Sequence, residues 1–169
     1  ADTSGSMNGR PICTSVGLAI YFAQHNHGPY HNKFMTFAAQ PRFVNLKGQT
    51  LVDCLNEVPW DICENTNIEV AFDLILKVAV DNHLEQKDLP KSLIIISDME
   101  FDAAQNFQYD WTNGGYIKRD YTTLMKAKYE AAGYELPTIV YWNADAREDT
   151  FHAKATTPGV QFISGQSTS

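Results

Sequence analysis

Apolar side chains recur at helical spacing in two long segments of the chain, and each stripe predicts a helix. The first helix is expected over about 11–24, because Pro11 is typical of a first helical turn. The second is expected over about 68–82, and a further helix over about 121–132 would end at Gly133. The two stripes consist of Ile12, Val16, Ala19, Ile20 and Ala23, and of Ile68, Phe72, Ile75, Leu76 and Ala79.

Shorter apolar runs lie between these helices and predict strands over 92–97, 138–142 and 160–164. Residues 33–38 and 42–46, joined by a turn at Gln40-Pro41, are expected to form an antiparallel pair at a sheet edge, followed by a short helix over 50–58. Strands thus alternate with helices. This order predicts an α/β fold with a doubly wound, mostly parallel sheet and helices on both faces.

Composition supports one compact domain spanning residues 1–169, since 44% of the residues are hydrophobic. No apolar run reaches the roughly 18 residues that a membrane span requires. The net charge of −7 disfavours nucleic-acid binding, which needs clustered Lys and Arg. The three cysteines lack metal-type spacing and no Asn-x-Ser/Thr sequon occurs, so we expect an intracellular, cytoplasmic protein without membrane contact.

The run Asp2-Thr3-Ser4-Gly5-Ser6 carries the clearest chemistry in the chain. In an extended loop every second side chain points the same way, so Asp2, Ser4 and Ser6 can converge on one cation. A carboxylate with two hydroxyls suits Mg²⁺ or Mn²⁺, and the absence of Cys and His from the run argues against zinc. The same residue types are also common helix N-caps, and the pentapeptide alone leaves both interpretations open.

Two later positions favour the cation site. Asp98 follows the apolar run 92–97 and should lie at the carboxyl edge of the sheet, where open α/β folds bind ligands. Thr66 stands in a polar loop directly before the helix expected from Ile68, where it offers another hydroxyl or serves as a helix cap.

The ordered set Asp2, Ser4, Ser6, Thr66 and Asp98 resembles the metal-ion-dependent adhesion site of von Willebrand factor A domains. The segments 97–102, 133–137, 140–143 and 159–165 look like an uncharacterised intracellular family that carries such a domain at its C-terminal end. A more distant similarity is to the A domain of Ro-type ring proteins. The resemblance implies that these five residues hold Mg²⁺ or Mn²⁺ directly or through water. One position would then stay open for an Asp or Glu of a partner protein.

The resemblance also implies a central apolar strand leading into the first Asp, yet only Ala1 precedes Asp2. We therefore expect a sequence clipped at both ends from a longer protein, with the first central strand missing. Glu64 stands where the wider family has a small glycine-rich loop, and an acid there would weaken recruitment of an acidic partner or occupy the open position itself.

The stretch 101–120 is the longest expected irregular segment and carries five aromatic residues, among them Trp111. It is interpreted either as a partner surface beside the metal or as a cover over an exposed sheet edge. Glu100 and Asp102 lie next to Asp98 in the sequence. In a strand-like path Glu100 points with Asp98, where it either supplies an oxygen in the outer shell of the site or is a solvated acid.

These residues favour cation-dependent protein binding over catalysis. The rival is a Mg²⁺-dependent hydrolase or phosphotransferase, but haloacid-dehalogenase-type phosphatases need a second Asp two residues after the first, where this chain has Ser4. No glycine-rich phosphate loop followed by Lys occurs either. A third alternative is a structural domain whose ion only stiffens its loops.

Overall fold

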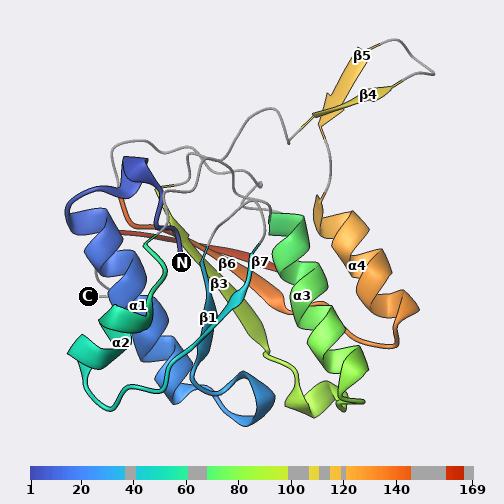
Figure 1. Ribbon diagram of the computed structural model, residues 1–169. Coiled ribbons are helices and arrows are strands. Elements are labelled where there is room, and N and C mark those ends of the chain that lie inside the picture. Colours follow the sequence, from blue (N-terminus) through green and yellow to red (C-terminus); the bar gives the residue numbers. More distant parts are fainter. Residues whose placement is uncertain are drawn as a thin grey trace.

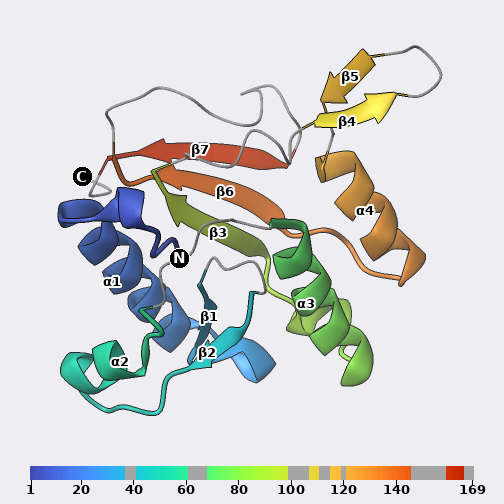
Figure 2. The same ribbon diagram turned by 45° about the horizontal axis from the view of Figure 1, so that its top comes forward.

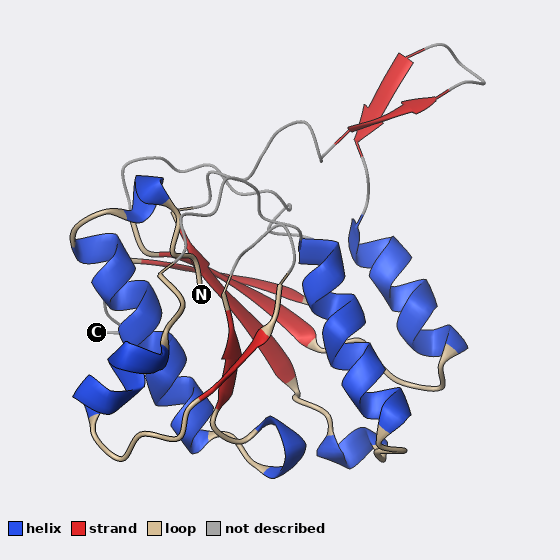
Figure 3. Cartoon of the chain, in the orientation of Figure 1, coloured by secondary structure: helices blue, strands red, loops and turns tan. Residues whose placement is uncertain are grey.

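The computed structural model describes residues 1–36, 41–60, 68–98, 107–110, 115–118, 121–145 and 159–165 (Figure 1). Its principal sheet contains β3 (Ser92–Ser97), β6 (Thr138–Asn143) and β7 (Val160–Ser164), all parallel and in the order β3-β6-β7. Near-continuous apolar runs such as Leu93 to Ile96 are typical of parallel strands covered on both faces, because both sets of alternating side chains must be buried. Helices cover both faces (Figure 3).

One face packs against α3 (Ile68–Asp81) and α4 (Tyr121–Ala131). The Tyr129 hydroxyl donates a hydrogen bond of 3.0 Å to the carbonyl of Phe72, which ties the two helices together inside the core. Lys128 of α4 reaches across to Asp73 and Glu69 of α3 at 2.9 and 3.0 Å. The buried cluster on this face contains Phe72, Ala79, Leu89, Ile95, Met125, Tyr129, Ile139 and Tyr141.

The other face packs against α1 (Arg10–His25), in which Pro11 occupies the first turn as its sequence position predicts. Trp142 and Ile96 of the sheet are buried there with Met7, and Phe22 of α1 meets Trp142 edge to face at 6.4 Å. Because Ile96 and Ile95 point to opposite faces, β3 joins both cores.

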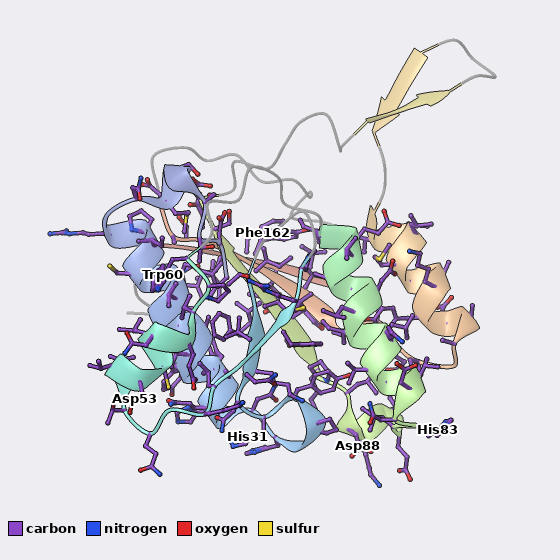
Figure 4. The ribbon with its side chains drawn as sticks, viewed as in Figure 1. His31, Asp53, Trp60, His83, Asp88 and Phe162 are labelled. Carbon is purple, nitrogen blue, oxygen red and sulfur yellow. The ribbon has the colours of Figure 1, made fainter. Side chains whose placement is uncertain are left out.

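A second, smaller sheet lies beside α1 and pairs β1 (Lys33–Met35) with β2 (Phe43–Asn45) in antiparallel register (Figure 2). The helix α2 (Leu51–Glu57) follows, and Thr50 and Asp53 form a reciprocal capping box at its start (Figure 4). These elements share one apolar cluster with α1, which contains Val16, Ala19, Ile20, Ala23, Phe34, Val44, Leu46, Cys54 and Val58.

The expectation of an irregular stretch over 101–120 is wrong for part of its length. Within this stretch, strands β4 (Phe107–Asp110) and β5 (Gly115–Lys118) pair in antiparallel register. The four residues between them, 111–114, include Asn113-Gly114, residue types that are common in hairpin connections. Three single 3₁₀ turns complete the described elements: η1 (Gly5–Met7), η2 (Gly28–Tyr30) and η3 (Gln86–Asp88).

The expected mixed α/β class and the parallel principal sheet are therefore confirmed. The described strands form three separate sheets, however, and not the single doubly wound sheet that the order of elements predicts. The principal sheet ends at β3 and the smaller sheet ends at β1 (Figure 1). Ala1 and Asp2 lie between these two strands and bond to Met35 and Ile96.

Candidate functional site

Asp2 lies at the carboxyl end of β3, where it is 3% exposed. Its backbone N–H donates to the carbonyl of Ile96 at 2.9 Å, and the Ser15 hydroxyl of α1 lies 3.0 Å from the same nitrogen. Ser15 in turn donates to the carbonyl of Ile96 at 3.2 Å. The position of Asp2 is thus fixed from both β3 and α1, which removes most of its freedom to move.

Both carboxylate oxygens of Asp2 accept hydrogen bonds from nearby groups. The backbone N–H of Ser4 donates to Oδ1 at 2.9 Å, and the Ser97 hydroxyl donates to Oδ2 at 2.5 Å. The Ser97 oxygen also lies 3.4 Å from Oδ1 of Asp98. Since a hydroxyl carries one proton, Ser97 donates to the nearer Asp2 and stands between the two acids.

Ser97 is a residue that the sequence interpretation did not select. It is fully buried, although it is polar and ends an otherwise apolar strand. That combination is the signal which singles it out, because a buried hydroxyl requires a partner.

The two serines of the N-terminal run also come together. The hydroxyl oxygens of Ser4 and Ser6 lie 3.0 Å apart, with Ser6 exposed to solvent. Ser4 occupies the N-cap position of η1, but its side chain makes no capping hydrogen bond. The helix-cap interpretation of this serine is therefore wrong, and its hydroxyl points instead to the neighbouring serine.

The structure brings together four of the five residues predicted to bind the ion. Asp2 contacts the Ser4 backbone, Ser4 contacts Ser6, and Ser97 links Asp2 with the half-buried Asp98. The remaining predicted residues lie outside the described part of the chain: Glu64, Thr66, Glu100, Asp102 and Trp111.

The donor set suits a hard cation. Adjacent oxygens of an octahedron with bonds near 2.1 Å stand about 3 Å apart, which is the separation of the Ser4 and Ser6 hydroxyls. Within the described ranges, no three His, Cys, Asp or Glu side chains gather closely enough to hold a metal, so the described part of this site offers hydroxyls and the two acids Asp2 and Asp98. Such a set fits Mg²⁺ or Mn²⁺ better than a softer metal.

The described helices include none long and apolar enough to cross a membrane. Phe162 of β7 stacks on Tyr141 of β6, with ring centroids 5.7 Å apart.

Comparison with known sequences gives two matches. The profile of the family described as "Domain of unknown function (DUF7788)" matches residues 1–169. "Uncharacterized protein L728" of Acanthamoeba polyphaga mimivirus is 30% identical over 151 residues, which cover 84% of this chain. The same stretch is 23% of the viral protein, so the chain spans about a quarter of that relative's length.

Proposed function

The chain belongs to the DUF7788 family, and from its site geometry we propose that this domain binds Mg²⁺ or Mn²⁺ and uses the ion to bind a partner protein. We propose further that the domain is of the von Willebrand factor A kind and acts inside the cell. The partner would contribute an Asp or Glu side chain.

The observation that carries this proposal is the way in which Asp2 is held. Burying a carboxylate costs several kcal/mol unless hydrogen bonds compensate, and here a backbone N–H and the Ser97 hydroxyl meet its two oxygens. A buried acid that is fixed beside two converging hydroxyls and a second acid is expensive to build for stability alone. The arrangement fits a preorganised cation site.

The chain's own residues have distinct parts in such a site. Ser4 and Ser6 would offer neutral oxygens, while Asp2 and Asp98 supply negative charge, with Thr66 as a further hydroxyl by the family resemblance. A bound divalent ion supplies a positive charge with room for one more oxygen ligand. Within the described residues, Asp2 and Asp98 balance the charge of the ion but do not fill its six oxygen positions, so a carboxylate from outside can take one of them.

The described residues of the site do not include the second acid that hydrolysis of this type needs. A phosphatase of the haloacid-dehalogenase type needs a second acid two residues after Asp2, and Ser4 occupies that position with its hydroxyl toward Ser6. Protein binding requires no proton transfer. Binding is therefore favoured over turnover, with a purely structural ion as the second alternative.

Isothermal titration of the metal-free protein with Mg²⁺ tests the ion site. Asp2→Asn keeps the shape of the side chain but removes its charge, so we expect at least a tenfold loss of affinity. Thr66→Ala, which removes a neutral oxygen, should have a smaller effect. Asp81→Asn is the matched control, because Asp81 is an exposed acid at the end of α3 that pairs with Lys77. Equal affinity in Asp2→Asn and Asp81→Asn would refute the site.

Partner capture separates the three alternatives. Under the proposal, a partner is retained in Mg²⁺, is released by chelator, and is lost in Asp2→Asn but not in Asp81→Asn. Hydrolysis of p-nitrophenyl phosphate that disappears in Asp2→Asn would instead establish an enzyme. Tight Mg²⁺ binding with chelator-insensitive partner capture would leave only the structural role.

A further inference from the structure

Ser97 differs from the other serine of its strand in burial and in what it contacts. β3 begins with Ser92, which is exposed, and ends with Ser97, which is fully buried. The Ser97 hydroxyl lies 2.5 Å from Oδ2 of Asp2 and 3.4 Å from Oδ1 of Asp98. Its single proton goes to the nearer acid, so this hydroxyl acts on Asp2.

The backbone of Ser97 is held by the neighbouring strand. Its carbonyl accepts a hydrogen bond of 2.9 Å from the N–H of Ala144, and the register of the sheet sets Ser97 opposite Asn143 of β6. Asn143 is buried too, so this end of the pair of strands is enclosed by protein. The hydroxyl of Ser97 therefore starts from a fixed point of the sheet, and it can hold Asp2 without moving toward it.

A carboxylate whose backbone is fixed can still turn at its end. The torsion about the Cβ–Cγ bond of an Asp side chain is broad, because the bond joins an sp³ to an sp² carbon. In Asp2 the two oxygens have donors from different parts of the chain, the N–H of Ser4 at 2.9 Å from Oδ1 and the hydroxyl of Ser97 at 2.5 Å from Oδ2. The Ser4 bond is local, whereas the Ser97 bond ties the carboxylate to the sheet. Together they fix its rotation.

The neutral oxygens of the site have a spacing that suits a small ion. The Ser4 and Ser6 hydroxyl oxygens are 3.0 Å apart. Neighbouring ligands of an octahedral ion stand about 3.0 Å apart at a Mg²⁺–oxygen distance of about 2.1 Å, but about 3.4 Å apart at a Ca²⁺–oxygen distance of about 2.4 Å. Ca²⁺ also takes about six to eight oxygens in flexible arrangements. The choice between the two ions therefore depends on how far the acids of the site can adjust.

From these contacts we propose that Ser97 is the positioning residue that sets the ion selectivity of the site. Its hydrogen bond holds the Asp2 carboxylate in one orientation, which admits Mg²⁺ or Mn²⁺ and disfavours Ca²⁺. This role rests on the proposed ion site and adds to it the residue that determines the preferred ion. Ser97 acts through Asp2 and is not itself a ligand. A larger ion requires Asp2 to turn, and turning breaks a buried hydrogen bond to a charged group, which is costly.

The competing explanation is that Ser97 only satisfies a buried acid. Asp2 is almost fully buried, and such a carboxylate needs hydrogen bonds whether or not an ion binds. Loss of a merely stabilising bond lowers the affinities for Mg²⁺ and Ca²⁺ by the same factor. Loss of a bond that sets the orientation of Asp2 lowers the affinity for Mg²⁺ more. The ratio of the two affinities therefore separates the two explanations.

Isothermal titration of the metal-free protein with Mg²⁺ and with Ca²⁺ tests this role. In Ser97→Ala we expect the Mg²⁺ affinity to fall about tenfold, as is typical when a partner of a metal ligand is removed, and the Ca²⁺ affinity to change less than about twofold. Ser97→Cys keeps a side chain of similar size with a weaker donor, so its affinity ratio should lie between those of the wild type and Ser97→Ala. Ser92→Ala is the matched control, because it removes the exposed serine hydroxyl at the other end of the same strand.

A second measurement needs no metal. Amide hydrogen exchange reports whether the Ser4 N–H keeps its bond to Asp2, and in Ser97→Ala that amide should exchange at least about fivefold faster. Ser92→Ala should leave its rate unchanged. The amide of Ala144, which bonds to the Ser97 carbonyl, should keep its rate in both variants and thereby shows that the sheet is intact. Ser97→Cys provides the same comparison if Ser97→Ala does not fold.

The outcomes separate the role of Ser97 from the ion site itself. Equal losses of Mg²⁺ and Ca²⁺ affinity in Ser97→Ala, as expected of a direct ligand or of a structural role, would overturn the selectivity and leave the ion site in place. An unchanged affinity ratio together with an unchanged Ser4 amide would do the same. A wild-type protein that binds neither ion would refute the ion site and the selectivity with it.

Discussion

The two edges of β3 differ although one short apolar sequence forms both. Toward β6 the strand is paired along its whole length, from Ser92 opposite Thr138 to Ser97 opposite Asn143. Toward β1, within the described chain, the backbone of the strand bonds at Ile96 to Asp2 and to the Ser15 hydroxyl, and a cavity lies beside the rest of this edge. The hydrogen bonds to β6 hold β3 rigidly. Asp2 is bonded to the opposite edge of the same strand, at the end where the candidate ion site lies.

This difference indicates how the site acid is positioned. Ser97 pairs with Asn143 of β6 on one side and donates a hydrogen bond to Asp2 on the other. The paired side of β3 therefore positions Asp2 on the open side. Four changes test that contrast between the two sides.

The largest expected effect comes from removing matched aromatic side chains on the two sides. Phe72→Ala opens a hole in the cluster between α3, α4 and the sheet, and should lower the free energy of unfolding by about 4 kcal/mol. Phe34→Ala, beside the cavity, should cost at least about 1 kcal/mol less, because its surroundings already lack contacts. Urea denaturation measures both, and equal losses would contradict the contrast.

The second prediction concerns pH and a version of the protein whose first residue is Ala1, which then carries an amino group. Its pKa falls from 8.0 to about 5 on burial, so between these values the unfolded chain binds the proton and the folded chain does not. The stability of a protein that begins at Ala1 should therefore rise by about 3 kcal/mol from pH 5 to pH 8. Acetylation of Ala1 provides the control. A rise of the same size in the acetylated protein would assign it to other groups.

Binding of Mg²⁺ should raise the free energy of unfolding by slightly less than the pH change does. At a free concentration one hundred times the dissociation constant, a bound ion adds about 2.7 kcal/mol to the free energy of unfolding. Thermal melts with Mg²⁺, Mn²⁺ and chelator measure this. The shift should vanish in Asp2→Ala and persist in Phe34→Ala, and a midpoint unaffected by any of the three additions would remove the site.

The smallest effect is expected on the closed side, where Lys128 joins α4 to α3. Desolvation opposes the charge of Lys128, but the hydrogen bonds that its amine donates to Asp73 and Glu69 outweigh this effect and raise the pKa of the amine. Because its side chain is 35% exposed, Lys128→Met should cost only about 0.5–1 kcal/mol, and less in about 1 M NaCl. The exposed Lys77, paired with Asp81, is the matched control, and a larger loss in Lys77→Met would reverse the ranking.

Sequence patterns predicted the long elements well because each depends on local periodicity. The expected helices over 11–24 and 68–82 correspond to α1 and α3, and the three parallel strands occur at their expected places. The apolar stripe of α3 supplies Phe72 and Ile75 to the interior as predicted. The pairing of β4 with β5 was not predicted, because the sequence interpretation did not use the Asn113-Gly114 turn signal between them.

The candidate site was predictable only in part. The alternation of Asp2, Ser4 and Ser6 is a local pattern, and the structure does bring the two serine hydroxyls together. The role of Ser97 depends on a contact with Asp2 across the sheet, which no local pattern encodes. Whether β1 pairs with β3 depends on contacts between residues far apart in the sequence. The order of elements does not encode such contacts, and it therefore predicted one continuous sheet.

The hydrogen bond from Ser97 to Asp2 joins residues 95 positions apart in the chain. Closing so long a loop carries an entropic cost that is recovered only after α1, β1, α3 and β3 have assembled between its ends. Mutations in this contact should therefore speed unfolding while leaving the folding rate nearly unchanged. We therefore expect the candidate site to be completed late in folding, so that a partner which requires it would bind folded molecules and not those still folding.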